Sequence, residues 1–171
     1  MPKADIEADF TRLRAEKWEI SSAIDDGYNC IAFAVHDTQQ FWDPSMVGVR
    51  GYYWPPGIPR DWRIATLRKL YEIHGFRMCD SAILERGFEK IAIYSTSIDE
   101  GTHAARQLSS GLWTSKLGPC EDIEHESPEG LESQIYGKVA VFMKRKLVQP
   151  KNSKFSVFAL IETIWSSLRR G

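Results

Sequence analysis

The hydrophobic period of this 171-residue chain changes near residue 88, and that change limits the folds open to it. Before it, apolar residues recur at helical spacing, which predicts helices over residues 5–20, 30–40 and 61–75. After a short strand at 76–79, the pattern predicts strands over 89–95, 103–108, 112–116 and 136–143. Helices followed by an antiparallel sheet indicate the α+β class.

Two segments interrupt this plan. Residues 51–59 hold three prolines among aromatic side chains, so they predict an ordered aromatic loop. Residues 149–153 resemble a linker and lead to an amphipathic pattern over 155–170. We therefore expect one domain over residues 1–148, and a linker with an extra C-terminal helix over 149–171. That helix is expected to pack on the domain or on a protein partner.

Composition excludes several functions. Lys and Arg total 22 against 23 Asp and Glu, which gives no support for nucleic-acid binding. The N-terminus lacks an apolar leader, and no apolar stretch reaches the roughly 18 residues that span a bilayer. The three cysteines form no disulfide framework, which favours reduced thiols and a cytoplasmic protein without membrane contact.

Cys30 is the strongest candidate for chemistry. Asn29 can cap the helix that starts at Cys30, and a helix start lowers a thiol's pKa and offers N–H groups to an oxyanion. The alternative is a small buried apolar residue. Cys79 and Cys120 have no such placement.

A nucleophilic thiol needs a base, and His103 is the best of four histidines. It opens the predicted hairpin and is flanked by small residues. His36 is too far along the helix of Cys30, His74 ends a helix, and His125 is expected on an acidic loop. A histidine at the start of a strand without any partner is an equally open alternative.

The segment 28–33, Tyr-Asn-Cys-Ile-Ala-Phe, resembles the cysteine segment of NlpC-type cell-wall peptidases, and residues 103–115 resemble their histidine block. The matching pieces, spread over residues 25–145, also resemble a bacterial family of papain-like, transglutaminase-like cysteine hydrolase domains. This resemblance implies a papain-like fold in which the helix that carries Cys30 lies in the core and packs on the sheet. It also implies a Cys30–His103 pair.

The residue that orients His103 is open. The resemblance places Ser115 at that position, whereas Asp122 is the better partner for an imidazolium. Ile31-Ala32 also departs from the Ser-Gly of the NlpC pattern. Tyr28 and Asn29 beside the thiol, with Trp54 and Trp113, are candidate substrate contacts, although the aromatic side chains equally suit core packing.

These features predict a cysteine-dependent peptidase or amidase that forms an acyl-enzyme at Cys30 and needs no cofactor. Its substrate would be a peptide or another amide. A transglutaminase or deamidase would share the same thiol, and a catalytically silent interaction module would use the aromatic loop and the last helix. A metal site is disfavoured because the cysteines and histidines lack paired ligand spacing.

Overall fold

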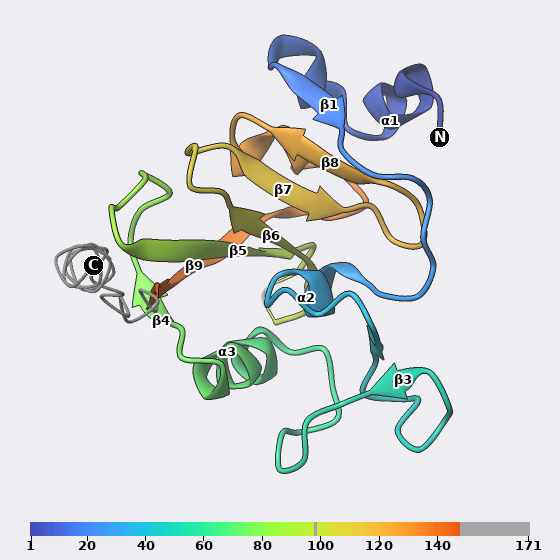
Figure 1. Cartoon of the computed structure of the whole chain (residues 1–171), viewed down its shortest axis with the longest axis vertical. Coiled ribbons are helices and arrows are strands. Elements are labelled where there is room, and N and C mark those ends of the chain that lie inside the picture. The colour runs from blue at the N-terminus through green and yellow to red at the C-terminus, as the bar shows by residue number, and fades with distance from the viewer. Residues whose placement is uncertain (98, 148–171) are drawn as a thin grey trace, which may run out of the picture.

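A seven-stranded antiparallel sheet forms the body of the molecule in the computed structural model, which describes residues 1–97 and 99–147. Its strand order is β1-β8-β7-β6-β5-β9-β4 (Figure 1). The strands are β1 (Trp18–Ile20), β4 (Arg77–Cys79), β5 (Phe88–Ser95), β6 (Gly101–Gln107), β7 (Trp113–Lys116), β8 (Asp122–His125) and β9 (Lys138–Lys146). The predicted linker and C-terminal helix lie outside the described residues.

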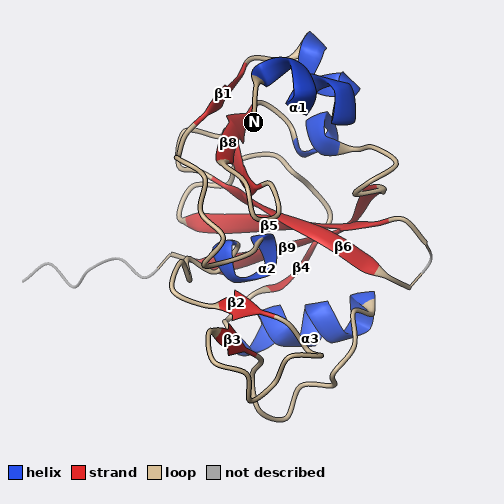
Figure 2. Ribbon diagram, turned by 90° about the vertical axis from the view of Figure 1, so that its right-hand side faces the viewer, coloured by secondary structure: helices blue, strands red, loops and turns tan. Residues whose placement is uncertain are grey.

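Short elements surround this sheet. The α-helices are α1 (Lys3–Asp9), α2 (Cys30–Phe33) and α3 (Ile64–Ile73). Two 3-10 turns, η1 (Thr11–Ala15) and η2 (Pro128–Leu131), accompany them, and β2 (Phe41–Trp42) pairs in parallel with β3 (Tyr52–Tyr53). α1 lies on one side of the sheet, whereas α2 and α3 lie on the other (Figure 2).

Each face of the sheet buries its own apolar cluster. Ile91 and Ile93 of β5 face α2 and α3, whereas Ala92 and Tyr94 face the N-terminal elements. This alternation follows from the pleat, which sends successive side chains to opposite faces. β5 is therefore buried on both faces and lies in the centre of the molecule.

The papain-like α+β prediction is wrong, because the described structure is rich in β-strands and contains only three short α-helices. α2 has four residues instead of the eleven predicted. The chain turns at His36, which has a left-handed φ of 68°, and Asp37 N–H bonds back to Ala32 O. The apolar run after Cys30 is buried by its surroundings and does not continue as a helix.

The N-terminal helix is also shorter than predicted. It covers residues 3–9, and residues 18–20 instead form the edge strand β1, which pairs with β8. Pairing with β8 overrides the helical spacing of this segment, because tertiary contacts outweigh weak local preferences. α3 and strands β4 to β7 and β9 occur where the sequence predicts them, with ends that differ by a few residues.

Candidate functional site

Asn29 fixes the position of Cys30. Its Oδ1 accepts a hydrogen bond from Ala32 N–H at 3.2 Å, which is the predicted N-cap, and its Nδ2 donates to Trp42 O at 2.8 Å. The buried amide thus joins the start of α2 to β2. Asn29 also lines the hollow described next, but these bonds already occupy both ends of its amide.

Cys30 is one of the residues that line a surface hollow of about 460 Å³. The walls come from segments far apart in sequence, with Phe41, Trp62, Thr102 and Tyr136 among them. This volume lies within the range of small-molecule binding sites. Cys30 itself has only 9% of its surface exposed, so it contributes little open surface to the wall.

Burial determines the protonation of this thiol. Desolvation raises the pKa of Cys30 to about 11, although the backbone N–H groups of Ala104, Cys30 and Ile31 act in the opposite direction. The sequence predicted a lowered pKa from the helix start alone. Because the sulfur is buried, the thiol form dominates at neutral pH in this arrangement.

The sulfur lies beside the edge of β6. The paired residues of β6 and β7 are Arg106 with Thr114 and Gln107 with Trp113, and Ala104 lies outside this ladder. Its backbone N–H lowers the pKa of the Cys30 thiol and so lies near the sulfur.

The structure does not bring the imidazole of His103 into contact with this thiol. Cys30 packs in the apolar cluster of Ala104, whereas the next side chain back along β6, His103, points to the opposite face. There its ring stacks on Tyr136 at 4.0 Å between centroids and meets the edge of Tyr94 at 5.1 Å.

His103 is fully buried, and neither ring nitrogen has a hydrogen-bond partner within the described part of the chain. Desolvation, assisted by the nearby His125, lowers the pKa of His103 to about 3, so the ring is neutral. Buried polar groups in folded proteins are almost always paired. The imidazole of His103, next to Ala104 in β6, is therefore an exception to this rule.

Ser115 pairs with a different histidine. Its Oγ lies 3.0 Å from Nε2 of His125, and Nδ1 of His125 lies 2.6 Å from Ser127 O. Because that carbonyl can only accept, Nδ1 carries the proton and Nε2 accepts from the serine hydroxyl. His125 was expected on a loop, but it is buried in β8, and desolvation lowers its pKa to about 4.

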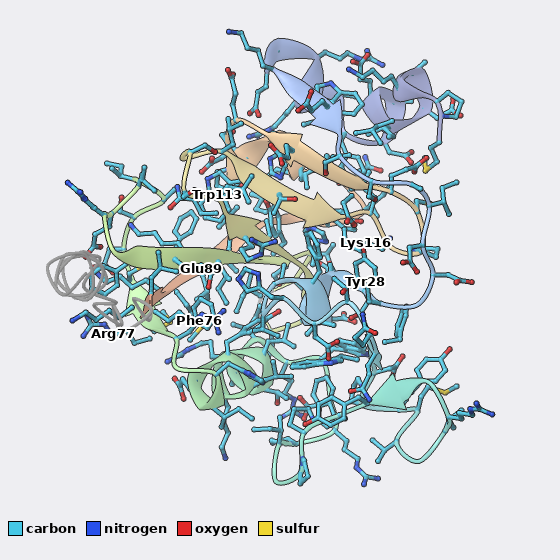
Figure 3. All side chains as sticks on the ribbon, viewed as in Figure 1. Tyr28, Phe76, Arg77, Glu89, Trp113 and Lys116 are labelled. Carbon is cyan, nitrogen blue, oxygen red and sulfur yellow. The ribbon has the colours of Figure 1, made fainter. Side chains whose placement is uncertain are left out.

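Asp122 bonds Tyr28 and does not contact His103. The Tyr28 hydroxyl donates to Asp122 Oδ2 at 2.7 Å, and both desolvation and this carboxylate raise the pKa of the tyrosine. The ammonium of Lys116 lies 3.7 Å from Asp122 Oδ1 and 4.5 Å from the centre of the Tyr28 ring (Figure 3). It also donates to Cys120 O.

The sequence alone assigns no role to Lys116, which is fully buried. The available signal was its position in a strand, next to Ser115 and therefore on the other face. Through Tyr28, this buried cluster of Lys116, Asp122 and Tyr28 holds the segment that leads into Cys30.

Residues 19–144 match a family model described as Domain of unknown function (DUF7689). The chain belongs to this family. The matched region runs from β1 into β9 and contains Cys30, His103 and the buried cluster around Lys116. No curated protein and no solved structure matches the chain. The family match therefore does not link the chain to NlpC-type or papain-like enzymes.

The tryptophans predicted to contact substrate are packed in the interior of this DUF7689 domain. Trp113 is 1% exposed and lies near Phe142, on the face of the sheet away from Cys30. Trp54 is 5% exposed, donates to Pro59 O and meets the edge of Trp62. Trp62, two residues before α3, is the tryptophan that lines the hollow.

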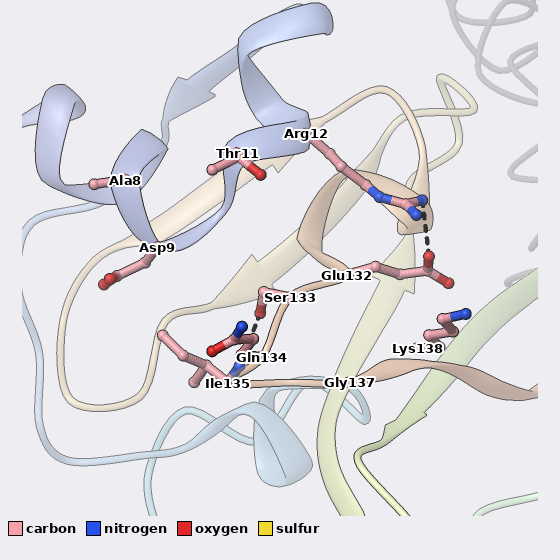
Figure 4. A pocket seen from close by; sticks show the side chains of 10 residues that line it. All are labelled: Ala8, Asp9, Thr11, Arg12, Glu132, Ser133, Gln134, Ile135, Gly137 and Lys138. Atoms are coloured by element: carbon pink, nitrogen blue, oxygen red, sulfur yellow. Dashed lines mark hydrogen bonds and ion pairs between the residues drawn. The ribbon is translucent and has the colours of Figure 1, made fainter.

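A larger hollow of about 530 Å³ lies elsewhere on the domain, between the N-terminal turns and the segment 132–138 (Figure 4). Arg12 and Glu132 form an ion pair across it at 2.8 Å. No cysteine or histidine lines it, so it offers no thiol and no imidazole. The hollow at Cys30 is the better candidate for chemistry.

The described residues do not meet the requirements of a metal site or of a membrane-spanning helix. Among residues 1–97 and 99–147, no three histidine, cysteine or acidic side chains gather as a metal site requires. Within the same part of the chain, no helix combines the length and the apolar character that crossing a bilayer takes.

Proposed function

We propose that this domain is a cysteine-dependent hydrolase of peptidase or amidase type, in which Cys30 forms an acyl-enzyme with an amide-bearing substrate. The observation that carries the proposal is that Cys30 lines the 460 Å³ hollow, with backbone N–H groups of Ala104 and Ile31 near enough to favour its thiolate. Such groups can donate to the oxyanion that forms when a thiolate attacks a carbonyl.

His103 is the proposed base. Its neutral imidazole can accept the thiol proton, and both of its nitrogens are free of partners within the described residues. In the structure described the ring lies on the other face of β6, stacked on Tyr136, so the proposed proton transfer requires this contact to rearrange when substrate binds.

The chemical steps then balance. The Cys30 thiol passes its proton to His103 as sulfur bonds to the carbonyl carbon. His103 then donates this proton to the amine as the carbon–nitrogen bond breaks, which leaves the thioester. Water next attacks the thioester, gives up a proton through His103 and releases the carboxylic acid and the free thiol. An amine in place of water would make the same site a transglutaminase, and a glutamine side chain as substrate would make it a deamidase.

Trapping of the acyl-enzyme tests this proposal. The protein would be incubated with a pool of peptide amides and probed with an acyl vinyl sulfone, and adducts would be located by peptide mass spectrometry. We expect an adduct at Cys30 that Cys30→Ala abolishes and the matched Cys79→Ala retains. His103→Gln should slow its formation at least 100-fold, as loss of a general base does. Absence of any Cys30 adduct would remove the hydrolase proposal.

A specific observation favours a second candidate, a binding module without turnover. The pKa of Cys30 is raised to about 11 and that of His103 is lowered to about 3, which is the reverse of an activated pair. A domain of this kind would bind its ligand in the hollow, and the Cys30→Ala variant would bind that ligand as tightly as the wild type does. The trapping experiment separates the two candidates.

We also propose a reducing compartment, the cytoplasm, because all three cysteines are free. Neither a nucleic acid nor a membrane is part of the proposal.

A further inference from the structure

The charged side chains in the hollow at Cys30 are all acidic. Asp43 lies at the end of β2 and Glu100 directly before β6, and no lysine, arginine or histidine is among the lining residues. Across the whole chain the two signs of charge are nearly balanced, at 22 basic and 23 acidic residues. The one-sided lining is therefore a local property of this hollow.

Among the described residues neither Asp43 nor Glu100 takes part in an ion pair. Arg63 lies opposite Glu100 in an isolated bridge, but it pairs with Asp99. Asp43 Oδ1 accepts from the backbone and hydroxyl of Ser45 at 2.8 Å and 2.6 Å, which fixes the carboxylate in place. Both negative charges thus act on whatever enters the hollow.

Three aromatic side chains also form part of the wall. Phe41, Trp62 and Tyr136 line the hollow, and each is held by another ring. Phe41 packs on Tyr52, Trp62 meets the edge of Trp54, and Tyr136 stacks on His103. Aromatic faces beside carboxylates favour ammonium and guanidinium groups, because the ring quadrupole attracts a cation.

The thiol gives an independent reason to expect a ligand here. Cys30 is nine-tenths buried, has no hydrogen bond to another side chain among the described residues and is one of the residues that line the same hollow. We infer that the substrate is cationic: an amide whose scissile carbonyl lies next to an ammonium or guanidinium group, as in a lysine- or arginine-containing peptide. This inference rests on the proposed function for the reaction, but its charge preference can be measured without turnover.

Three small alkylating agents of different charge provide the measurement. 2-Bromoethylammonium, iodoacetamide and iodoacetate each transfer an alkyl group to sulfur as halide leaves and the thiol proton passes to buffer. Adducts at Cys30, Cys79 and Cys120 would be quantified by peptide mass spectrometry at low salt. Rates would be divided by those of the urea-unfolded chain, which removes the intrinsic reactivity of each reagent.

We expect the cation-to-anion rate ratio at Cys30 to exceed that at Cys79 about tenfold, and to shrink as salt is added. The double variant Asp43→Asn, Glu100→Gln should bring the ratio at Cys30 down to that of Cys79. The matched variant Asp5→Asn, Glu72→Gln removes the same charge from exposed positions on α1 and α3 and should leave the ratio unchanged.

Equal ratios at the two cysteines, or a ratio that the Asp43 and Glu100 changes leave intact, would overturn the inference. Complete protection of Cys30 in the folded chain would overturn it too, because no ligand could then reach the thiol. A cation preference without any acyl-enzyme would instead uphold the binding preference and reject the hydrolase. The two proposals can therefore fail separately.

Discussion

A fully buried lysine ammonium requires compensation at the scale of single side chains. Lys116 finds it in the Asp122 carboxylate, the ring of Tyr28 and the carbonyl of Cys120. Asp122 is in turn bonded to the Tyr28 hydroxyl. The three side chains are interdependent, since removal of one leaves a buried polar group without its partner.

Lys116→Met should therefore lower the free energy of unfolding by about 3 kcal/mol, because the nearly buried Asp122 carboxylate loses its cation. Urea unfolding at pH 7 measures this change. Lys116→Met combined with Asp122→Asn should recover part of the loss, and Lys69→Met at an exposed site on α3 should change stability by under about 0.5 kcal/mol. A single variant as stable as wild type would contradict the role given to the cluster.

The buried histidines make stability depend on pH. Desolvation lowers the pKa of His103 to about 3 and that of His125 to about 4, against roughly 6.5 in an unfolded chain. Below pH 6.5 the unfolded chain thus binds more protons than the folded one. The free energy of unfolding should fall by about 1 kcal/mol per pH unit for each histidine as the pH is lowered.

Urea unfolding between pH 7 and 5 tests this slope, above the range in which exposed carboxyl groups titrate. His103→Gln should remove a large part of it, since glutamine does not titrate. The same slope in wild type and in this variant would show that His103 is not buried as a neutral ring.

At the scale of elements, the segment 133–137 positions the ring that covers His103. Ser133 and Gly137 form an isolated bridge, and Tyr136 between them stacks on the imidazole. Gly137 has a left-handed φ of 75°, and a Cβ at this position would overlap the carbonyl of Ser95. Only glycine fits both requirements.

Gly137→Ala should accordingly destabilise the fold by at least about 2 kcal/mol, through backbone strain together with overlap. Gly48→Ala is the matched control, because Gly48 has a φ of 88° with open space around its position. It should cost about 1 kcal/mol from strain alone. Thermal unfolding compares the two, and equal losses would show that the overlap with Ser95 is relieved at no cost.

The sequence predicted the elements whose signal is local. β5 and the β6–β7 hairpin have apolar runs and a Ser-Ser-Gly turn, and they occur as expected. β8 was missed because its acidic residues indicate a loop, whereas Asp122 is buried with the help of Lys116 and of Tyr28, which is 94 positions away. The predicted length of α2 was wrong for a similar reason. The apolar residues of the segment 31–35 are buried because they pack against the sheet, and not because they lie on one face of a longer helix.

The predicted Cys30–His103 pair shows where sequence reasoning stops. The order of the elements does bring the start of α2 to β6, and the N–H of Ala104 reaches the thiol. Which face His103 occupies depends on strand register, and a shift of one residue reverses it. No spacing within a single sequence contains that information.

At the scale of the whole molecule, the two apolar clusters share one sheet. Alternate residues of β5 belong to different clusters. If one cluster unfolds and β5 is lost with it, the other cluster therefore loses its central strand as well. The sheet thereby couples the hollow at Cys30, on one face, to the buried histidines on the other. We expect unfolding to be a single cooperative transition.

Incorporated 5-fluorotryptophan allows a direct test, because Trp54 belongs to one cluster and Trp113 to the other. Their fluorine resonances should disappear at the same urea concentration. Ile91→Ala, which removes a fully buried side chain from the cluster of Trp54, should shift both midpoints equally by the equivalent of about 3 kcal/mol. Ile83→Ala, at a side chain that is 78% exposed, should shift neither. A midpoint for Trp113 that stays in place while that of Trp54 moves would mean that the faces unfold independently, and that the thiol side can rearrange without disturbing the ring of His103.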